Sequence, residues 1–159
     1  MLLYMSNANR EGRSMSLHSV SVAGVVVRED GRVLVIKRAD NGAWEAPGGV
    51  LELDERPEEG TCREVLEETG IKVETESLTG VYKNMKRGVV ALVFRCRLVG
   101  GEERTSDESV DVRWFNREEV ESHMVEAYAV RVLDALSDQV PQVRAHDGRR
   151  LLTQDSPAA

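Results

Sequence analysis

Apolar residues gather in five separate runs along the chain, and each run predicts a β-strand. Residues 18–28 alternate at first and then become continuously apolar, which is typical of a strand buried on both faces. Residues 32–38 predict the returning strand, because Asp30-Gly31 between the two runs is a tight hairpin signal. Residues 89–99 form the most apolar run and are the candidate for a central strand. Two further strands are predicted at residues 72–82 and 110–115.

One segment with helical periodicity spans residues 57–69. Pro57 suits a first helical position, where its missing N–H group would be unsatisfied in any case. Gly70 suits the left-handed residue that ends a helix. Each helical residue turns about 100°, so four residues share a stripe that we expect to face the core. They are Cys62, Val65, Leu66 and Thr69.

A second helical region follows the last predicted strand. Asn116, with Glu119 three residues later, has the spacing of a capping box and predicts a helix start. Residues 125–136 predict the next helix, with four residues in its core-facing stripe. They are Val125, Tyr128, Val132 and Leu136.

The chain of 159 residues fits one domain with a sizeable core, and its net charge of -7 argues against nonspecific nucleic-acid binding. We expect a flexible leader at residues 1–16, a domain at residues 17–137 and a loosely ordered tail at residues 138–159. Cys62 and Cys96 are too few for a disulfide framework and are expected to be buried thiols. No apolar run is long enough for a signal core or a membrane span, so a cytoplasmic location is expected.

The helix at residues 57–69 also carries three carboxylates opposite its apolar stripe. Glu64, Glu67 and Glu68 stand at i, i+3 and i+4, where like charges repel. Arg63 can reach Glu67 but cannot neutralise all three acids. Hard divalent cations such as Mg²⁺ or Mn²⁺ can do so, because they favour oxygen ligands. The alternative is a solvated acidic helix face, which is the usual fate of a run of charges.

The stretch around these acids has a specific pattern over residues 49–71. Gly49 and Glu55 are followed by Arg63-Glu64-Val65-Leu66-Glu67-Glu68-Thr69-Gly70-Ile71. This stretch resembles the Nudix box of MutT-like hydrolases at every fixed position, and the preceding WEAPG at residues 44–48 resembles the family's approach to the box. Elsewhere the resemblance is to the general layout.

The resemblance implies a fold and a reaction. The fold is an α/β/α sandwich with a mixed sheet and the box as a loop-helix-loop, which agrees with the order of predicted elements. The reaction is Mg²⁺- or Mn²⁺-dependent hydrolysis of a diphosphate linkage in a nucleoside diphosphate linked to another moiety. A nucleoside triphosphate, a nucleotide sugar and a dinucleotide all have such a linkage.

The resemblance also assigns metal ligands. It implies that the carbonyl of Gly48 coordinates a metal, together with the carboxylates of Glu64 and Glu68. Glu67 is expected to share metal or water contacts. No zinc-like histidine spacing competes with this oxygen-rich set.

Other residues are expected to orient or assist the reaction. Glu55 and Arg63 match family positions that fix the loop and the helix by polar contacts. Some family members use a glutamate of the box as general base and others one in a later loop. Asp107 or Glu108 is the candidate in this chain, and we favour Glu108; the alternative is that both are ordinary loop acids.

The substrate is less determined. The residues that follow the box at 86–88 match neither the proline nor the tyrosine that marks the ADP-ribose-like and diadenosine-polyphosphate-like branches. The longer downstream motif of NADH-cleaving members is also absent. Basic residues can attract phosphates and an aromatic residue can stack on a base, although solvated surface residues are the alternative. The candidates for substrate binding are Arg38, Trp44, Lys83, Lys86 and Arg87.

A second hypothesis is a non-catalytic Nudix-like module that senses a nucleotide. Such a module is expected to lack the box acids, and this chain keeps Arg63 and all three glutamates, which favours the hydrolase. The expected partner is a nucleotide-diphosphate small molecule, with neither nucleic acid nor membrane as a partner. A homodimer stays open as an alternative to a monomer.

Overall fold

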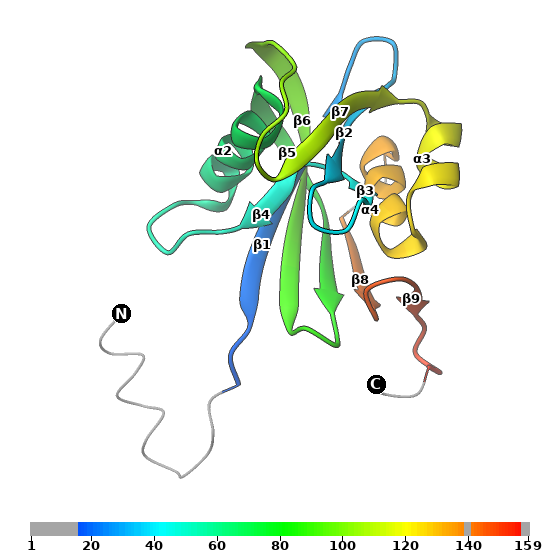
Figure 1. Cartoon of the computed structure of the whole chain (residues 1–159). Helices are drawn as coiled ribbons and strands as arrows, with labels where there is room; N and C mark the ends of the chain where they lie inside the picture. The colour runs from blue at the N-terminus through cyan, green and yellow to red at the C-terminus, as the bar shows by residue number, and fades with distance from the viewer. Residues whose placement is uncertain (1–15, 139–140, 157–159) are drawn as a thin grey trace.

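A mixed β-sheet with helices on both faces forms the protein, as the sequence predicts (Figure 1). The structure is a computed structural model that describes residues 16–138 and 141–156. The helices are α2 (Pro57–Thr69), α3 (Arg117–His123) and α4 (Glu126–Leu136). The strands are β1 (Ser19–Val27), β2 (Val33–Arg38), β3 (Trp44–Glu45), β4 (Gly48–Val50), β5 (Ile71–Asn84), β6 (Val89–Gly101), β7 (Ser109–Phe115), β8 (Gln142–His146) and β9 (Leu151–Leu152).

Strand β6 lies in the middle of the sheet, in agreement with its prediction from the most apolar run. The strand order is β3-β2-β1-β6-β5-β8-β9, while β4 pairs with β1 and β7 pairs with β2. The β1–β6 pair is parallel and runs from Ser19↔Val89 to Val27↔Arg97. The β5–β6 pair is antiparallel.

The sheet buries a separate apolar cluster on each face. Successive strand residues point to opposite faces, so Val26 packs in the cluster that contains Val65 of α2, while Val25 packs in the other. That other cluster contains Val120 of α3 and Val132 of α4. Helix α2 therefore covers one face, and α3 and α4 cover the other (Figure 1).

The predicted core stripe of the first helix is partly wrong. Val65 and Thr69 are fully buried, but Leu66 is 38% exposed. The buried stripe runs through Thr61, Val65 and Thr69, four residues apart, and it is turned toward Glu64 and Glu68 rather than toward Leu66. The helix thus buries two of its carboxylates together with its apolar side.

The stripe predicted for residues 125–136 is also only partly correct. Val132 is buried, whereas Tyr128 and Leu136 are half-buried at the edge of the cluster. Val125 is the N-cap of α4 rather than a helical residue. The fully buried side chains are mostly small, because α4 packs closely on the sheet. They are Ala127, Val132 and Ala135.

The prediction of a loosely ordered tail is wrong for much of residues 138–159. Strand β8 pairs in parallel with β5, and β9 returns antiparallel to β8. This segment is held by backbone pairing and polar contacts rather than by buried apolar side chains. Val143 is 82% exposed, and Arg144 is paired with Asp134. A hydrophobic period is therefore not visible in its sequence. Almost all of the predicted leader lies outside the described residues. No helix in the described ranges is long and apolar enough to cross a membrane.

Candidate active site

The box helix α2 begins and ends where the sequence predicts. Pro57 is its first residue, and Gly70 ends it with φ of 76° and an N–H bond to the carbonyl of Leu66. At the other end, the N–H of Arg56 donates to the carboxylate of Glu59 at 2.9 Å. These caps fix the helix that presents the glutamates.

Arg63 links the helix to the loop before it. Its Nε and Nη2 donate to the two carboxylate oxygens of Glu55, at 2.9 and 2.6 Å. Its Nη1 donates to Glu64 at 2.8 Å and to Glu67 at 3.2 Å. The Arg63 hydrogen bonds, and then the N–H of Glu52, lower the pKa of Glu55 to about 2. One guanidinium therefore holds three acids of the box in a fixed relation.

Two glycines let strand β4 lie directly against the carboxylates. The N–H of Gly48 donates to Oε1 of Glu68 at 2.7 Å. A Cβ atom at Gly49 would lie 2.6 Å from the carboxylate of Glu64, and one at Gly48 would lie 2.3 Å from the carbonyl oxygen of Val22. Neither position has room for a side chain.

Negative charge in this site is not fully balanced. Glu68 is 4% exposed, and burial raises its pKa to about 8, although the Gly48 N–H bond opposes the shift. The neighbouring carboxylates of Glu64, Glu45 and Glu108 add to the increase. Burial also raises the pKa of Glu64, against the effect of Arg63. Both groups would gain from a nearby cation.

The donor set fits a hard divalent metal ion. Glu64, Glu67 and Glu68 line one cleft, beside the backbone of Gly48. Carboxylate and carbonyl oxygens are the ligands that Mg²⁺ prefers. In the described part of the chain, no three acids, histidines or cysteines already converge on one point as a finished metal site. Arg63 holds two of the carboxylates, so metal binding would require side-chain adjustment.

The cleft has a volume of about 800 Å³ and collects some of the predicted residues. Arg38, Arg87, Asp107 and Glu108 line it together with the box acids. Arg38 is already paired, because it contacts Asp40 at 2.6 Å and Glu45 at 3.0 Å.

Three predicted substrate-binding residues lie elsewhere. Trp44 packs on Phe115, with ring centroids 4.9 Å apart, in the cluster under α3 and α4. Lys86 is exposed in the turn after β5, and Lys83 is half-buried on that strand. None of the three lines the cleft. Their types suited a nucleotide, but nothing in the sequence indicated the direction of their side chains.

The loop before β7 is fixed against the box. Ser109 is fully buried, and its hydroxyl donates to the carbonyl of Glu68. Nη2 of Arg104 donates to the carbonyl of Leu66 at 3.2 Å, at the end of α2. The carbonyl of Glu108 accepts the N–H of Ala39 at 2.9 Å. These contacts hold Glu108 at the rim of the cleft.

Several residues of the cleft were not predicted from the sequence. Glu45, Asn84, Tyr128 and Arg131 all line it. The sequence holds one signal for Arg131, which is the single cation of the mostly apolar helical run AYAVRVLDAL. The others became recognisable only when the sheet brought β3, β5 and α4 together.

The chain is similar to proteins of a known family. The sequence model of the NUDIX domain matches residues 17–136. The chain belongs to the Nudix family. A MutT-like protein of Streptomyces ambofaciens is 65% identical over 152 residues, which cover 96% of this chain and 98% of that protein. An ADP-ribose pyrophosphatase of Methanocaldococcus jannaschii is 34% identical over 107 residues, which cover 63% of each chain.

Solved Nudix structures have the same fold. A Nudix hydrolase from Nitrosomonas europaea has a TM-score of 0.72 and 25% identity, covering 84% of this chain and 82% of that one. A MutT protein from Bacillus halodurans has a TM-score of 0.67 and 26% identity, covering 85% and 95%. This chain is therefore a Nudix hydrolase. The family acts on nucleotide-diphosphate substrates and generally uses divalent metal ions.

Proposed function

We propose that this enzyme hydrolyses a diphosphate linkage in a nucleoside diphosphate linked to another moiety, with Mg²⁺ or Mn²⁺ as its cofactor, in the cytoplasm. The observation that carries the proposal is the buried carboxylate of Glu68, whose pKa is about 8 beside the acids of the same helix. A cluster of unbalanced carboxylates destabilises the protein unless a cation occupies it.

The box residues have distinct roles in this proposal. Glu64, Glu67, Glu68 and the carbonyl of Gly48 hold the metal. When bound, a divalent ion polarises phosphoryl oxygens and lowers the pKa of a water molecule. Arg63 keeps the carboxylates of Glu64 and Glu67 oriented through its 2.8 and 3.2 Å contacts.

Glu108 accepts the proton of the attacking water, and Arg38 and Arg87 attract the phosphates. Glu108 lines the cleft, and its backbone is bound to Ala39. A general base must reach the proton that it removes, and the rim position is compatible with that. Asp107 also lines the cleft and is the alternative base.

Water attacks phosphorus directly, without a covalent enzyme intermediate. Thr61 is buried and donates to the carbonyl of Pro57 at 2.8 Å. Cys62 faces the apolar cluster, and burial raises the pKa of its thiol. Among the described residues that line the cleft, none is a cysteine or a histidine. No activated nucleophile is therefore positioned for attack.

The test is a panel of nucleoside triphosphates, dinucleotides and nucleotide sugars with Mg²⁺, with products identified by mass. One chemical class should be cleaved at its diphosphate, and excess chelator should stop the reaction. Undiminished hydrolysis in chelator would contradict the metal assignment.

The same reaction in ¹⁸O-water tests the direction of attack. We expect one heavy oxygen in a phosphate-bearing product and none in a sugar hydroxyl, in the first turnover as in later ones. Unlabelled phosphate in the first turnover would reveal a protein nucleophile, and label on a sugar carbon would show C–O cleavage.

A further inference from the structure

Arg131 places a positive charge in the cleft that the reaction described above does not use. The residue lies on α4 and lines the same cleft as the box acids. Its guanidinium lies over two tyrosine rings, 4.6 Å from the centroid of Tyr128 and 5.3 Å from that of Tyr82. Because Tyr82 is fully buried, these contacts fix the guanidinium in one place.

Few acceptors among the described residues face the guanidinium of Arg131. Its Nε is buried without a hydrogen-bond partner, and no carboxylate of the described residues lies within ion-pair distance of it. Its Nη2 contacts Nε2 of His146 at 3.2 Å.

The contact with His146 does not give Arg131 a hydrogen-bond acceptor. The N–H of Gly148 donates to Nδ1 of His146 at 3.0 Å, so a donor group faces each ring nitrogen. A neutral imidazole has one acceptor nitrogen. Burial lowers the pKa of His146 to about 4, so the ring is neutral near pH 7. When Nδ1 accepts from Gly148, Nε2 carries a proton and cannot accept from Arg131.

Two other guanidiniums that line the cleft differ from Arg131. Arg63 bonds three carboxylates and Arg38 bonds two. Glu45, whose charge acts on Arg131, is itself bound to Arg38 at 3.0 Å. Burial lowers the pKa of Arg131, yet an arginine stays protonated in proteins.

Arg87 adds a second unpaired cation to the cleft. It is exposed in the turn after β5, and no ion pair joins it to any described acid. Asn84, the last residue of β5, also lines the cleft, and its Oδ1 accepts the N–H groups of Lys86 and Arg87, at 3.1 Å each. The cleft therefore has acids at the box and cations without acid partners on β5's turn and α4.

We propose that Arg131, assisted by Arg87, binds an anionic phosphate group of the substrate other than the diphosphate that is cut. This inference rests on the proposed function, because it names a substrate class for the same cleft: nucleotides that carry a further phosphate. A desolvated cation is stabilised most by an anion, and a guanidinium matches phosphate oxygens with two parallel N–H groups.

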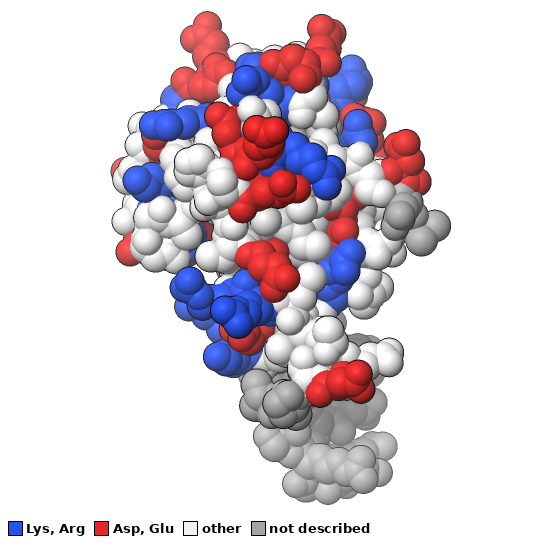
Figure 2. Space-filling view, turned by 90° about the vertical axis from the view of Figure 1, so that its right-hand side faces the viewer, with Lys and Arg blue, Asp and Glu red and all other residues white. Residues whose placement is uncertain are grey.

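On the view of Figure 2, a group of Lys and Arg side chains lies at the lower left, next to acidic ones higher on the same face. A phosphate group would approach the cations more easily than the box acids, which repel it until a metal is bound.

The first test uses the full chain in excess chelator, with inorganic phosphate as the probe in calorimetric titration. Without metal the box acids repel phosphate, so binding reports the cationic side of the cleft. Arg131→Gln should weaken binding by about tenfold, as expected for a lost charged hydrogen bond, and Arg87→Gln by less. The control Arg117→Gln, on the exposed part of α3, should leave binding unchanged.

Equal phosphate binding by the parent and Arg131→Gln would overturn the proposal, and so would no binding by the parent. Arg87→Gln guards against misfolding of the Arg131 variant, since Arg87 is exposed. If Arg131→Gln does not fold, Arg131→Met replaces it, since Met removes the charge and keeps an apolar stem; unchanged binding by both Arg87→Gln and Arg131→Met would overturn the proposal. This measurement involves no turnover, so a failed hydrolase assignment would not affect its outcome.

The second test separates a substrate phosphate from free phosphate. With Mg²⁺ and the substrate found in the panel, inorganic phosphate should inhibit competitively. In Arg131→Gln, KM should rise, kcat should change little, and the inhibition should weaken. Non-competitive inhibition, or a fall in kcat at constant KM, would show that the substrate does not occupy this position.

Discussion

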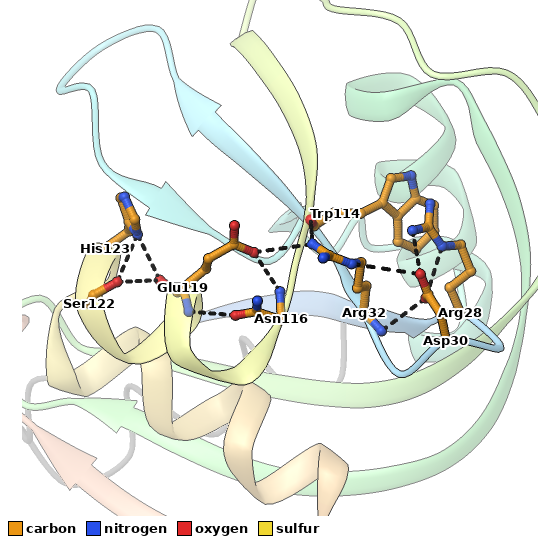
Figure 3. Close-up of polar contacts among 8 residues, drawn as sticks. All are labelled: Arg28, Asp30, Arg32, Trp114, Asn116, Glu119, Ser122 and His123. Atoms are coloured by element: carbon orange, nitrogen blue, oxygen red, sulfur yellow. Dashed lines mark hydrogen bonds and ion pairs between the residues drawn. The ribbon is translucent and has the colours of Figure 1, made fainter.

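Helices α2 and α3 both begin with a capping box, but their acids have opposite environments. At α3, the carboxylate of Glu119 accepts the N–H of Asn116 at 2.7 Å and contacts Arg32 at 3.4 Å (Figure 3). Arg32 and Arg28 in turn contact Asp30, the latter at 2.6 Å. Cations and anions alternate through this network, and its charged side chains are partly exposed to solvent.

At α2 the acids outnumber the cations, and two of them, Glu64 and Glu68, are buried. The pKa of Asp30 is lowered to about 2, mainly by its hydrogen bonds to Arg28, whereas burial raises that of Glu68 to about 8. Two carboxylates of one protein are thus shifted in opposite directions. The charges of the α3 network balance one another, whereas the acids of the α2 cluster are balanced only when a cation binds, as the proposed function requires.

The largest expected effect comes from Glu68→Gln. The amide keeps the shape and can still accept the N–H of Gly48, but it removes one charge from the metal-binding set. Activity should fall by orders of magnitude, and stability should not fall, because repulsion between carboxylates decreases. Glu67→Gln should act in the same direction.

The matched control is Glu119→Gln on α3, which should retain activity. Steady-state kinetics and thermal melts of these variants would measure the effects on activity and on stability separately. If Glu68→Gln were largely unfolded while its folded fraction stayed fully active, the box acids would be structural, and the contrast with α3 would fail.

The next effect concerns pH and the buried side chain of His146. Burial, and then the charge of Arg131, lower its pKa from 6.5 to about 4, so the unfolded chain binds a proton that the folded chain excludes. This contribution to stability is fully present above pH 6.5 and is lost as the pH falls toward 4. Each pKa unit corresponds to about 1.4 kcal/mol, which gives a loss of roughly 3 kcal/mol.

Denaturant unfolding at several pH values would measure this loss. His146→Asn should be less stable at pH 7 and should lack the part of the pH dependence between 6.5 and 4. If the free energy of unfolding depended equally on pH in both proteins, groups other than His146 would cause that dependence. His146 is the cationic counterpart of Glu68, since burial disfavours the charged form of both side chains.

Packing of the box helix gives a third effect. Val65→Ala should destabilise the protein by about 2 kcal/mol, because Val65 is fully buried in the cluster beneath α2. Leu66→Ala should cost no more than about 0.5 kcal/mol, since that side chain is 38% exposed. A larger loss for Leu66→Ala would mean that α2 is rotated relative to the structure described here.

The sequence was sufficient where the signal was local. The limits of α2 follow from Pro57 and Gly70, and the central position of β6 follows from its apolar run. The box glutamates were found because a short pattern places them at fixed spacing on one helix.

Features that depend on contacts between distant parts of the chain could not be predicted from the sequence. The strand β8 has no clear period, and its parallel pairing with β5 joins residues more than 60 positions apart. Leu66 was assigned to the core because a helical stripe predicts neighbours on a helix but not which side meets the sheet. Arg131 enters the cleft only when α4 packs against the sheet.

The smallest expected effect comes from Asp30→Asn in the network of α3. The amide oxygen can still accept the N–H of Arg32, a contact of 3.2 Å, but the change removes the charge and one of the two hydrogen bonds from Arg28. Activity should equal that of the parent, because Asp30 does not line the cleft. The lowered pKa of Asp30 means that its contribution is present above pH 4 and is lost as the pH falls toward 2. Melting curves at low and high salt would test this: the parent should exceed the variant slightly at low salt, and the difference should vanish at high salt, because exposed pairs are screened. A salt-independent difference would show that Asp30 acts through packing, and the contrast between the two helix starts would then not be electrostatic.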